Sequence, residues 1–476
     1  MESPPDLKVA PPAPESQPDP EDVSRNREGQ DWKEHVLTLL REERNTELVA
    51  FLNDLYASDV AHLLERLDFH DGRQIFLLLD PEYQGEILHE VEDNLRERYL
   101  EDILEPDRVA KILLEQASDE AADLLEEIDI EVVSEILSHV PHEDRVKVTE
   151  LLSYPDNTAG GIMAKEFVAV REDETVKKAI NSLRKMSKET DEIHNVYVVD
   201  KLGRYKGHVR LDKLILAKPQ TKVKRIMKEE LLPIPVLTDQ EEVAQFFTRY
   251  DFITAPVIDE QGVLVGRITV DDVLEVIEEE ATEDIQRMGG VSGEETLTTP
   301  FFRSSLQRIV WLGLNLATAF LSAAVIGLFE TTIEKKVILS ALMPIVAGMG
   351  GNAGAQSMAL VIRNIALGEL TRGNTRRTLR RESLIGLMNG LSIGTLTGIA
   401  VALFTGEAAL GGVIFLALLF NLVVAATSGT LVPLFLRRIN IDPAIGSSIL
   451  VTTCTDVMGF LTFLGFALLA LGQGLI

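Results

Sequence analysis

The sequence predicts a multidomain membrane protein: a solenoid-like α-helical N domain, an α/β pair of repeated modules and an all-α domain of five membrane-spanning helices. Three observations predict this class, namely a regular recurrence of large apolar residues, a duplicated segment and five long apolar stretches after residue 300. A chain of 476 residues is also too long for one compact core. The domains are expected at 1–35 (a disordered tail), 36–153 (N domain), 154–273 (repeated modules), 274–300 (an acidic connecting helix and linker) and 301–476 (membrane domain).

The N domain is predicted from a period of about 12 residues in its large apolar side chains. These side chains are Leu52, Leu64, Phe76, Leu88, Leu100, Leu113, Leu125 and Leu137. This period is typical of short stacked helices, which form a small α-solenoid and commonly serve as interaction surfaces. An ordinary helical bundle with chance spacing is the alternative.

The repeated modules are predicted from two similar segments, "NVYVVDKLGRYKGHVRLDKL" at 195–214 and "TAPVIDEQGVLVGRITVDDV" at 254–273. Each alternates an apolar strand, an Asp-x-x-Gly turn, a second strand and the start of a helix. The pair resembles tandem CBS domains, a family that often senses adenine nucleotides with a hydroxyl toward phosphate and a carboxylate on ribose. The resemblance places Thr269 and Asp272 in these roles in the second copy, with Phe252 nearby, whereas the first copy has Arg210 and Lys213. ATP is therefore an expected ligand of one copy at most.

The connecting helix is predicted over "TVDDVLEVIEEEATEDIQRM", residues 269–288. On a helix, Asp272, Glu275, Glu279 and Glu283 fall within about 80° of one another, and Glu280 and Asp284 form a second acidic row. Like charges at this spacing destabilise a helix by about 0.2–0.5 kcal/mol per pair unless cations neutralise them. A solvated acidic face is the alternative. Because the helix joins the repeats to the membrane domain, we expect divalent cations to control how the two associate.

The membrane domain is predicted from apolar stretches at 309–329, 337–362, 383–406, 408–436 and 443–476, each long enough for the roughly 20 residues that a spanning helix needs. Residues 301–476 carry 12 Lys and Arg against 7 Asp and Glu, whereas the whole chain has a net charge of −29. This acidic N-terminal half argues against nucleic acid as a partner. Arginine-rich connections after the second and fourth spans place these loops and the N-terminal half in the cytoplasm and the C-terminus outside.

Two features of the spans indicate ion transport. The second span contains "PIVAGMGGNAGAQS", which predicts a broken helix that coordinates ions, although a glycine-rich packing surface is the usual alternative. The fifth stretch contains one charged residue, Asp456, at a cost of about 2.5–3.5 kcal/mol. Its structural alternative is a carboxylate bonded to Thr453 or Asn421. A single carboxylate per chain suits hydrated Mg²⁺ on the twofold axis of a homodimer.

The motifs "GGNAGAQS", "FNLVVAATSGTLVPLFLRR", "DPAIGSSILVTTCTD" and "EATEDI", in this order, resemble the MgtE family of magnesium channels and transporters. The resemblance implies a homodimeric, Mg²⁺-selective pore in the plasma membrane that cytoplasmic Mg²⁺ closes. It implies a pore ligand at Asp456 beside Gly350, Gly351 and Asn352, and gating ligands at Glu280, Glu283, Asp284 and Asp442. It further implies sensor ligands at Glu86, Asp119, Asp123, Asp239, Glu241, Asp251, Asp272 and Glu275.

Two other classes of function were compared with this expectation. A coupled secondary transporter of divalent cations would normally need a second ionisable site within the membrane, and the sequence offers none that stands out. An enzyme would need a nucleophile, yet Cys454 lies within a span and the eight histidines follow no pattern. We therefore expect a transport protein and no enzymatic activity.

Overall fold

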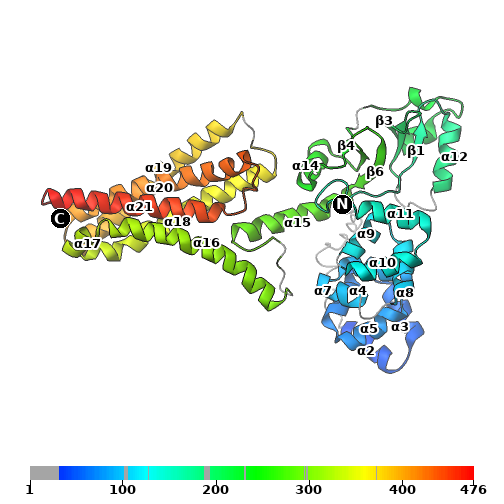
Figure 1. Ribbon diagram of the computed structural model, residues 1–476, viewed down its shortest axis with the longest axis horizontal. Coiled ribbons are helices and arrows are strands. Elements are labelled where there is room, and N and C mark those ends of the chain that lie inside the picture. The colour runs from blue at the N-terminus through cyan, green and yellow to red at the C-terminus, as the bar shows by residue number, and fades with distance from the viewer. Residues whose placement is uncertain are drawn as a thin grey trace, which may run out of the picture. The chain divides into compact units, whose positions relative to one another are not determined.

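The computed structural model describes residues 32–100, 105–126, 128–186, 193–229, 232–293, 295, 299–370 and 373–476. The predicted tail at 1–35 lies almost entirely outside these residues. The chain divides into two compact units, and each is described by itself (Figure 1). The first comprises residues 1–156, 163–170 and 177–193, and the second comprises residues 157–162, 171–176 and 194–476.

The N domain is an array of short helices in which alternate helices stack. Its helices are α2 (Trp32–Arg41), α3 (Asn45–Asn53), α4 (Ala57–Arg66), α5 (Phe69–Leu78), α6 (Pro81–Glu90), α7 (Asp93–Arg98), α8 (Pro106–Glu115), α9 (Ser118–Glu126), α10 (Ile130–His139) and α11 (His142–Leu151). Contacts connect α2 with α4, α4 with α6, α6 with α8, and α8 with α10. This regular stacking is that of a solenoid rather than of a bundle with chance spacing. All the predicted periodic positions are buried except Leu137, which is half-buried because the neighbouring Ile136 takes the core position.

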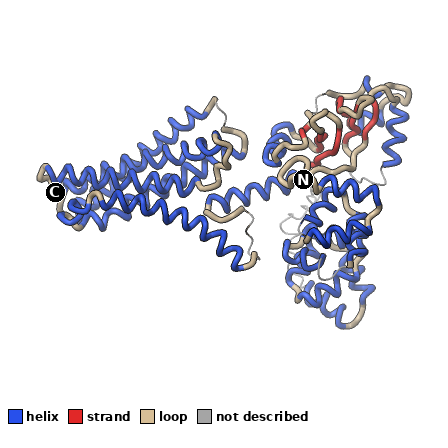
Figure 2. The backbone as a smooth tube through the Cα atoms, in the orientation of Figure 1, coloured by secondary structure: helices blue, strands red, loops and turns tan. Residues whose placement is uncertain are grey.

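The CBS-like repeats form two three-stranded sheets (Figure 2). The elements are β1 (Ala169–Arg171), α12 (Val176–Met186), β2 (Asn195–Val199), β3 (Tyr205–Arg210), α13 (Leu211–Leu216), β4 (Ile234–Pro235), α14 (Gln240–Tyr250), β5 (Thr254–Ile258) and β6 (Leu264–Thr269). The sheet orders are β1-β2-β3 and β4-β5-β6. In both copies the hairpin is antiparallel with a bulge at the same place, after Val198 and after Val257.

The hairpin turns explain why the repeat could be read from sequence. The Asp200 carboxylate accepts hydrogen bonds from the backbone N–H groups of Leu202 and Arg204, and Asp259 does the same for the corresponding residues of the second copy. Gly203 and Gly262 follow with φ of +78° and +79°, which glycine adopts without the steric cost that a side chain brings. The Asp-x-x-Gly pattern thus encodes the turn locally.

The connecting helix is α15 (Val270–Met288). Thr269 and Asp272 form a capping box at its start, which satisfies otherwise unpaired backbone donors. Val273 and Val276 are buried and fix its first turns, whereas Leu274 and Ile285 are 61% and 67% exposed. The side opposite the acidic row is therefore largely uncovered within one chain.

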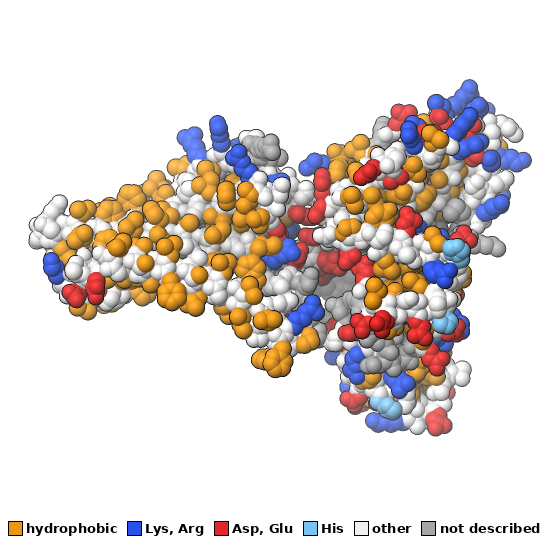
Figure 3. Space-filling model, viewed as in Figure 1, with side chains coloured by type: hydrophobic (Ala, Val, Ile, Leu, Met, Phe, Trp, Pro, Cys, Tyr) orange, Lys and Arg blue, Asp and Glu red, His pale blue; other side chains and the backbone are white. Residues whose placement is uncertain are grey.

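Five helices are long and apolar enough to cross a membrane: α16 (Phe301–Gly327), α18 (Ile338–Ala366), α19 (Thr375–Thr405), α20 (Ala408–Arg438) and α21 (Ser447–Gly472). A short helix, α17 (Glu330–Lys335), joins the first two. Helix α20 contacts α18, α19 and α21, whereas α16 packs mainly against α21. Their core includes Val346, Ile414, Leu418 and Phe463, and hydrophobic side chains cover the outside of the bundle (Figure 3). The predicted five-helix membrane domain is confirmed.

Candidate functional site

Asp456 is the tenth residue of α21, and its side chain is half-buried. Its carboxylate has no hydrogen bond or ion pair with any residue that the structure describes. The two structural partners that the sequence suggested bond elsewhere: the Thr453 hydroxyl donates to the Ile449 carbonyl at 2.6 Å, and the Asn421 amide donates to the Val346 carbonyl at 2.9 Å. A carboxylate within a membrane span thus lacks protein groups that would offset its cost.

The predicted break in the second span is wrong, because α18 is continuous from Ile338 to Ala366 with Pro344 inside it. Its glycines serve helix packing instead. A Cβ atom at Gly350 would lie 3.2 Å from the Thr455 Cβ, and one at Gly354 would lie 2.6 Å from the Val451 Cγ1. These glycines let α21 approach α18 closely, as small residues do in membrane bundles, and this contact keeps α18 helical.

The residues expected to line a pore beside Asp456 differ in accessibility. Gly350 is buried between α20 and α21, Gly351 is half-buried, and Asn352 is exposed. Gln356, one turn after Asn352 on α18, is also exposed. Since Gly350 packs against Thr455, Asn352 and Asp456 lie within two residues of the same contact between helices. Of the three predicted residues, Asn352 is the one whose side-chain oxygen is available to a ligand.

Asn421 on α20 is a residue whose role sequence reasoning missed. It is 1% exposed, its amide nitrogen bonds to α18, and its buried Oδ1 atom has no hydrogen-bond partner within the described residues. Gly350 and Gly459 lie so close that a side chain at either would contact this amide. Asn421 therefore joins α18, α20 and α21 close to Thr455 and Gly459. Its position in an apolar span was the available signal.

Glu382 on α19 is a second residue that the sequence did not single out, because it directly precedes the predicted span. It is 3% exposed, and its carboxylate accepts hydrogen bonds from the Ser357 hydroxyl at 3.1 Å and from Arg381 at 3.0 Å. It lines a cavity of about 190 Å³ with Gln356 and Asn389. A buried, partnered carboxylate therefore lies near one end of the membrane helices.

The four predicted gating carboxylates lie around the end of α15. Arg287 forms ion pairs with both Glu283 and Asp442, and its guanidinium lies 2.5 Å from the Asp442 carboxylate. Glu280 accepts a hydrogen bond from Gln240 at 2.8 Å. The α15 end is thus tied both to the loop before the last membrane helix and to the second CBS copy. Arg287 was not anticipated, since sequence reasoning considered only the acidic residues of this helix.

Burial and repulsion from neighbouring carboxylates raise the pKa values of Glu241, Glu283 and Asp284. Burial, then Glu280, Asp284, Asp239 and Asp442, raise the pKa of Glu241 from 4.5 to about 7. Burial raises the pKa of Glu283 to about 6 in spite of Arg287, with neighbouring carboxylates adding to the effect. Burial and the nearby Asp442 and Glu280 raise the pKa of Asp284 from 3.8 to about 6. The arrangement therefore disfavours full ionisation in the absence of a cation.

Part of this acidic group borders a cavity of about 340 Å³ between α14, α15 and the end of α18. Its lining includes Glu241, Glu280 and Asp284 together with Arg249 and Arg363. The Gln245 side chain crosses this region and donates to the Ala366 carbonyl at 2.9 Å. Within the described part of the chain, no group of three or more His, Cys, Asp or Glu side chains is close enough to hold a metal ion. The donor set of carboxylate oxygens nevertheless fits a divalent cation such as Mg²⁺.

The remaining predicted sensor residues of the second unit lie at helix ends. Asp239 is the N-cap of α14 and accepts a hydrogen bond from the Glu241 N–H group. Asp251 ends the same helix in the left-handed conformation, with φ of 53°. Asp272 belongs to the capping box of α15, whereas Glu275 is exposed one turn later. Of these four, only Asp239 is among the groups that raise the pKa of Glu241.

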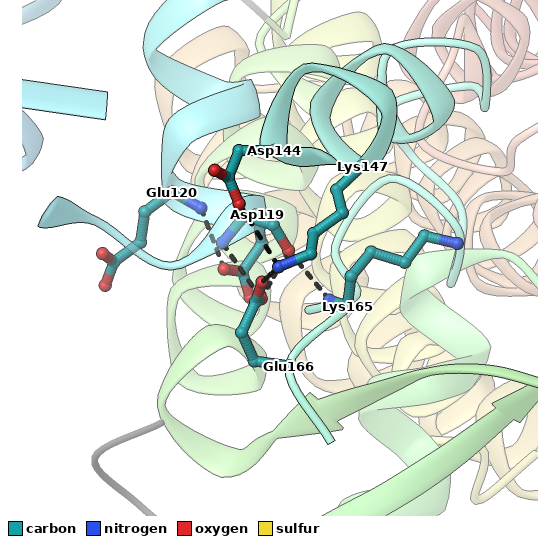
Figure 4. Close-up of polar contacts among 7 residues, drawn as sticks. Asp119, Glu120, Asp144, Lys147, Lys165 and Glu166 are labelled. Atoms are coloured by element: carbon teal, nitrogen blue, oxygen red, sulfur yellow. Dashed lines mark hydrogen bonds and ion pairs between the residues drawn. The ribbon is translucent and has the colours of Figure 1, made fainter. Parts of the chain in front are cut away.

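The N-domain sensor residues lie on two helices that contact each other, Glu86 on α6 and Asp119 and Asp123 on α9. Glu86 and Asp123 are exposed, while Asp119 is 7% exposed and accepts from the Glu120 N–H group. Beside Asp119, Figure 4 shows Lys147 reaching toward Glu166. Burial lowers the pKa of Lys147, but Glu166 and Asp144 outweigh it, so the pKa is raised. A fixed cation thus already lies close to this predicted site.

The residues predicted to bind a nucleotide contact other residues of the protein. The Thr269 hydroxyl donates to the Asp272 carboxylate at 2.5 Å, and the Phe252 ring stacks on Tyr250 at 5.5 Å between centroids. In the first copy, Arg210 pairs with Asp212. A nucleotide phosphate at Thr269 would therefore have to replace Asp272 at the start of α15.

Comparison with protein families gives three matches along the chain. The model of the MgtE intracellular N domain matches residues 55–157, that of the CBS domain matches residues 159–219 and 223–279, and that of the MgtE divalent cation transporter matches residues 343–466. A solved structure, the cytosolic domain of the Mg²⁺ channel MgtE in complex with ATP, shares 34% identity, covering 51% of this chain and 99% of that one, with a TM-score of 0.49.

Curated relatives extend over nearly the whole chain. The magnesium transporter MgtE of Bacillus subtilis is 30% identical over 91% of this chain and 96% of its own length. The Enterococcus faecalis protein of the same name is 31% identical over 92% of this chain and 98% of its own length. The Thermus thermophilus protein is 38% identical over 69% of this chain and 73% of its own length. Because relatives of 30% identity or more cover over nine-tenths of it, this chain belongs to the MgtE family of magnesium transporters.

Proposed function

We propose that two copies of this chain form a Mg²⁺-selective channel in the plasma membrane, with the N-terminal half in the cytoplasm and the C-terminus outside. The observation that carries the proposal is the Asp456 carboxylate, which lies within a membrane helix with no partner among the described residues. The exposed amide side chains of Asn352 and Gln356 on α18 support the presence of a second copy of the chain in the channel. Polar side chains in a membrane normally face protein or water.

In this proposal Asp456 attracts Mg²⁺ that keeps most of its water. Mg²⁺ gives up its hydration shell reluctantly and is commonly held by one or two carboxylates through its waters. Two Asp456 side chains on a twofold axis would provide such a site, and the Asn352 amide oxygens would accept hydrogen bonds from the retained waters. The ion in turn neutralises the charges that burial makes costly.

We further propose that cytoplasmic Mg²⁺ closes this pore by neutralising the carboxylates around α15. Glu241, Glu283 and Asp284 have raised pKa values because they are partly buried and because they lie close to Glu280 and Asp442. Divalent ions among them would remove this repulsion and hold α15 against the membrane helices, with the CBS and N-domain carboxylates adding further sites. Linkage then requires that the closed state bind more Mg²⁺ than the open state.

Coupled transport of a divalent cation is the second candidate function. It is favoured by the buried Glu382, which is a second ionisable group at the membrane helices. We expect purified protein in liposomes to pass Mg²⁺ current driven by voltage alone, with a reversal potential that follows the Mg²⁺ gradient. Mg²⁺ added to the side bearing the CBS repeats should reduce the current. A reversal potential that shifts with a proton or Na⁺ gradient, and that loses this shift in Glu382→Gln, would instead establish coupling.

Acidification of the metal-free protein is expected to substitute for Mg²⁺. A carboxyl group whose pKa is raised in the closed arrangement stabilises that arrangement when protonated. For Glu241 this contribution is complete below its ordinary pKa of 4.5 and is lost as the pH rises through about 7. We expect slow hydrogen exchange in residues 270–293 at about pH 5.5 in EDTA and fast exchange at about pH 8, after correction for intrinsic rates.

The matched variants for this experiment are neighbours on α14. Glu241→Gln should reduce the pH dependence and leave the part due to Glu283 and Asp284, whereas Glu242→Gln, at an exposed position, should retain all of it. Mg²⁺ at about pH 8 should restore slow exchange in the wild type. Exchange rates that are the same at both pH values would contradict the role assigned to Glu241.

A further inference from the structure

The start of α19 bears a basic surface that the proposed channel does not use. We define this α19 basic face by five exposed arginines, Arg376, Arg377, Arg380 and Arg381 on α19 and Arg438 at the end of α20. Helices α19 and α20 pack along each other in opposite directions, so these arginines lie at the same end of the bundle, where Figure 3 shows basic side chains. Arg381 pairs with Glu382, and the other four have no acidic partner within the described residues.

The spacing concentrates this charge on one side of α19. At about 100° per residue, the four α19 arginines fall within about 140°. They include two like-charged pairs at a spacing of four, Arg376 with Arg380 and Arg377 with Arg381, which destabilise a helix unless anions neutralise them. An anionic ligand on the α19 basic face would relieve this repulsion.

The residues that follow on α19 indicate where this ligand lies. Leu384, Leu387, Met388 and Leu391 are exposed large apolar side chains that begin within one turn of Arg381, and they are expected to contact lipid. Arg376 to Arg381 then occupy the two turns before the hydrocarbon region, at the depth of the lipid headgroups. A guanidinium group matches the geometry of a phosphate and can donate two hydrogen bonds to it.

We propose that the α19 basic face binds the phosphate groups of anionic phospholipids in the leaflet on the side of the CBS repeats. Clusters of arginine next to a membrane helix attract anionic lipids in this way. Arginines in this loop also fix the orientation of the spans, but orientation alone requires no ligand and would leave the purified, inserted protein indifferent to lipid charge. The two roles therefore make different predictions for the purified protein.

The test uses the purified protein in detergent. Its melting temperature is measured, and native mass spectrometry detects the lipid molecules that stay bound to it. Added short-chain phosphatidylglycerol should raise the melting temperature of the wild type, and the protein should retain phosphatidylglycerol molecules. Arg376→Gln/Arg377→Gln/Arg380→Gln/Arg438→Gln should bind this lipid at least about tenfold more weakly. Lys335→Gln, which removes an exposed cation at the opposite end of the bundle, should behave as the wild type.

Two further ligands distinguish an anionic phospholipid from a neutral phospholipid and from free phosphate. Short-chain phosphatidylcholine and inorganic phosphate at the same concentration should give little or no shift, because the first has no net charge and the second has no acyl chains. Without lipid, a melting temperature of the fourfold variant equal to or above that of the wild type would show that the variant folds. Equal retention of phosphatidylglycerol by both proteins would overturn the proposal, as would a shift of the same size with phosphatidylcholine or with inorganic phosphate.

Discussion

Asp456→Asn is expected to reduce Mg²⁺ flux to background without destabilising the protein. Asparagine has the same shape, and no described hydrogen bond or ion pair of Asp456 is lost by the change. Insertion of the span should become easier, because a charge in the membrane centre costs about 2.5–3.5 kcal/mol. The Mg²⁺ flux is therefore expected to fall, while the stability of the protein stays the same or rises. Mg²⁺ uptake into liposomes and the melting temperature of the purified protein measure the two effects.

Two neighbouring variants make this result specific to the carboxylate. Cys454→Ser alters an exposed side chain two residues away, and Thr453→Ala removes a hydroxyl that bonds to its own helix. Both should retain most of the wild-type flux. If Asp456→Asn lowered the melting temperature and retained flux, the carboxylate would serve the fold of the membrane domain and the proposed pore would lose its ion site.

The parts of the fold that sequence predicted correctly are those encoded by local chemistry. The CBS-like hairpins follow from Asp200 and Asp259, whose carboxylates build each turn with backbone groups within four residues. The N-domain helices follow from a repeated spacing of apolar residues, because each helix buries the same kind of side chain against its neighbours. The long spans follow from length and hydropathy alone.

The prediction for the second span failed because glycine and proline do not by themselves break a helix. Gly350 and Gly354 remain helical since α20 and α21 occupy the space that side chains would fill. Such close packing is decided by residues more than 60 positions away in the chain, which a reading of one motif does not include. The same motif is therefore compatible with an ion site and with a packing surface, and here its glycines pack.

The roles of Asn421, Glu382 and Arg287 were missed for a related reason. Each acquires its role from a partner that is distant in sequence: Asn421 from Val346, Glu382 from Ser357 and Arg287 from Asp442. Arg287 changes the picture of the acidic helix most, since one cation of the protein already lies between Glu283 and Asp442. Bound Mg²⁺ would therefore act on a site that is partly neutralised within the chain.

Glu280→Gln/Glu283→Gln/Asp284→Asn is expected to abolish the response of the channel to cytoplasmic Mg²⁺. Amides retain the size of the three side chains but bind Mg²⁺ far more weakly than carboxylates do. Mg²⁺ shifts the balance between open and closed states only if it binds one state more tightly. Whichever state the variant prefers, its current should not respond to Mg²⁺ on the CBS side up to a concentration at least about tenfold above the midpoint of inhibition of the wild type.

Glu278→Gln is the matched control for this variant, because Glu278 lies on α15, is exposed and does not border the cavity beside α14. Its Mg²⁺ response should equal that of the wild type, which excludes a general effect of lowering the charge of the helix. Retained flux through the threefold variant would show that the pore is intact, since Asp456 is unchanged. An unaltered midpoint of inhibition in the threefold variant would place the regulatory ions away from α15, because the carboxylates that repel one another there would then have no part in closure.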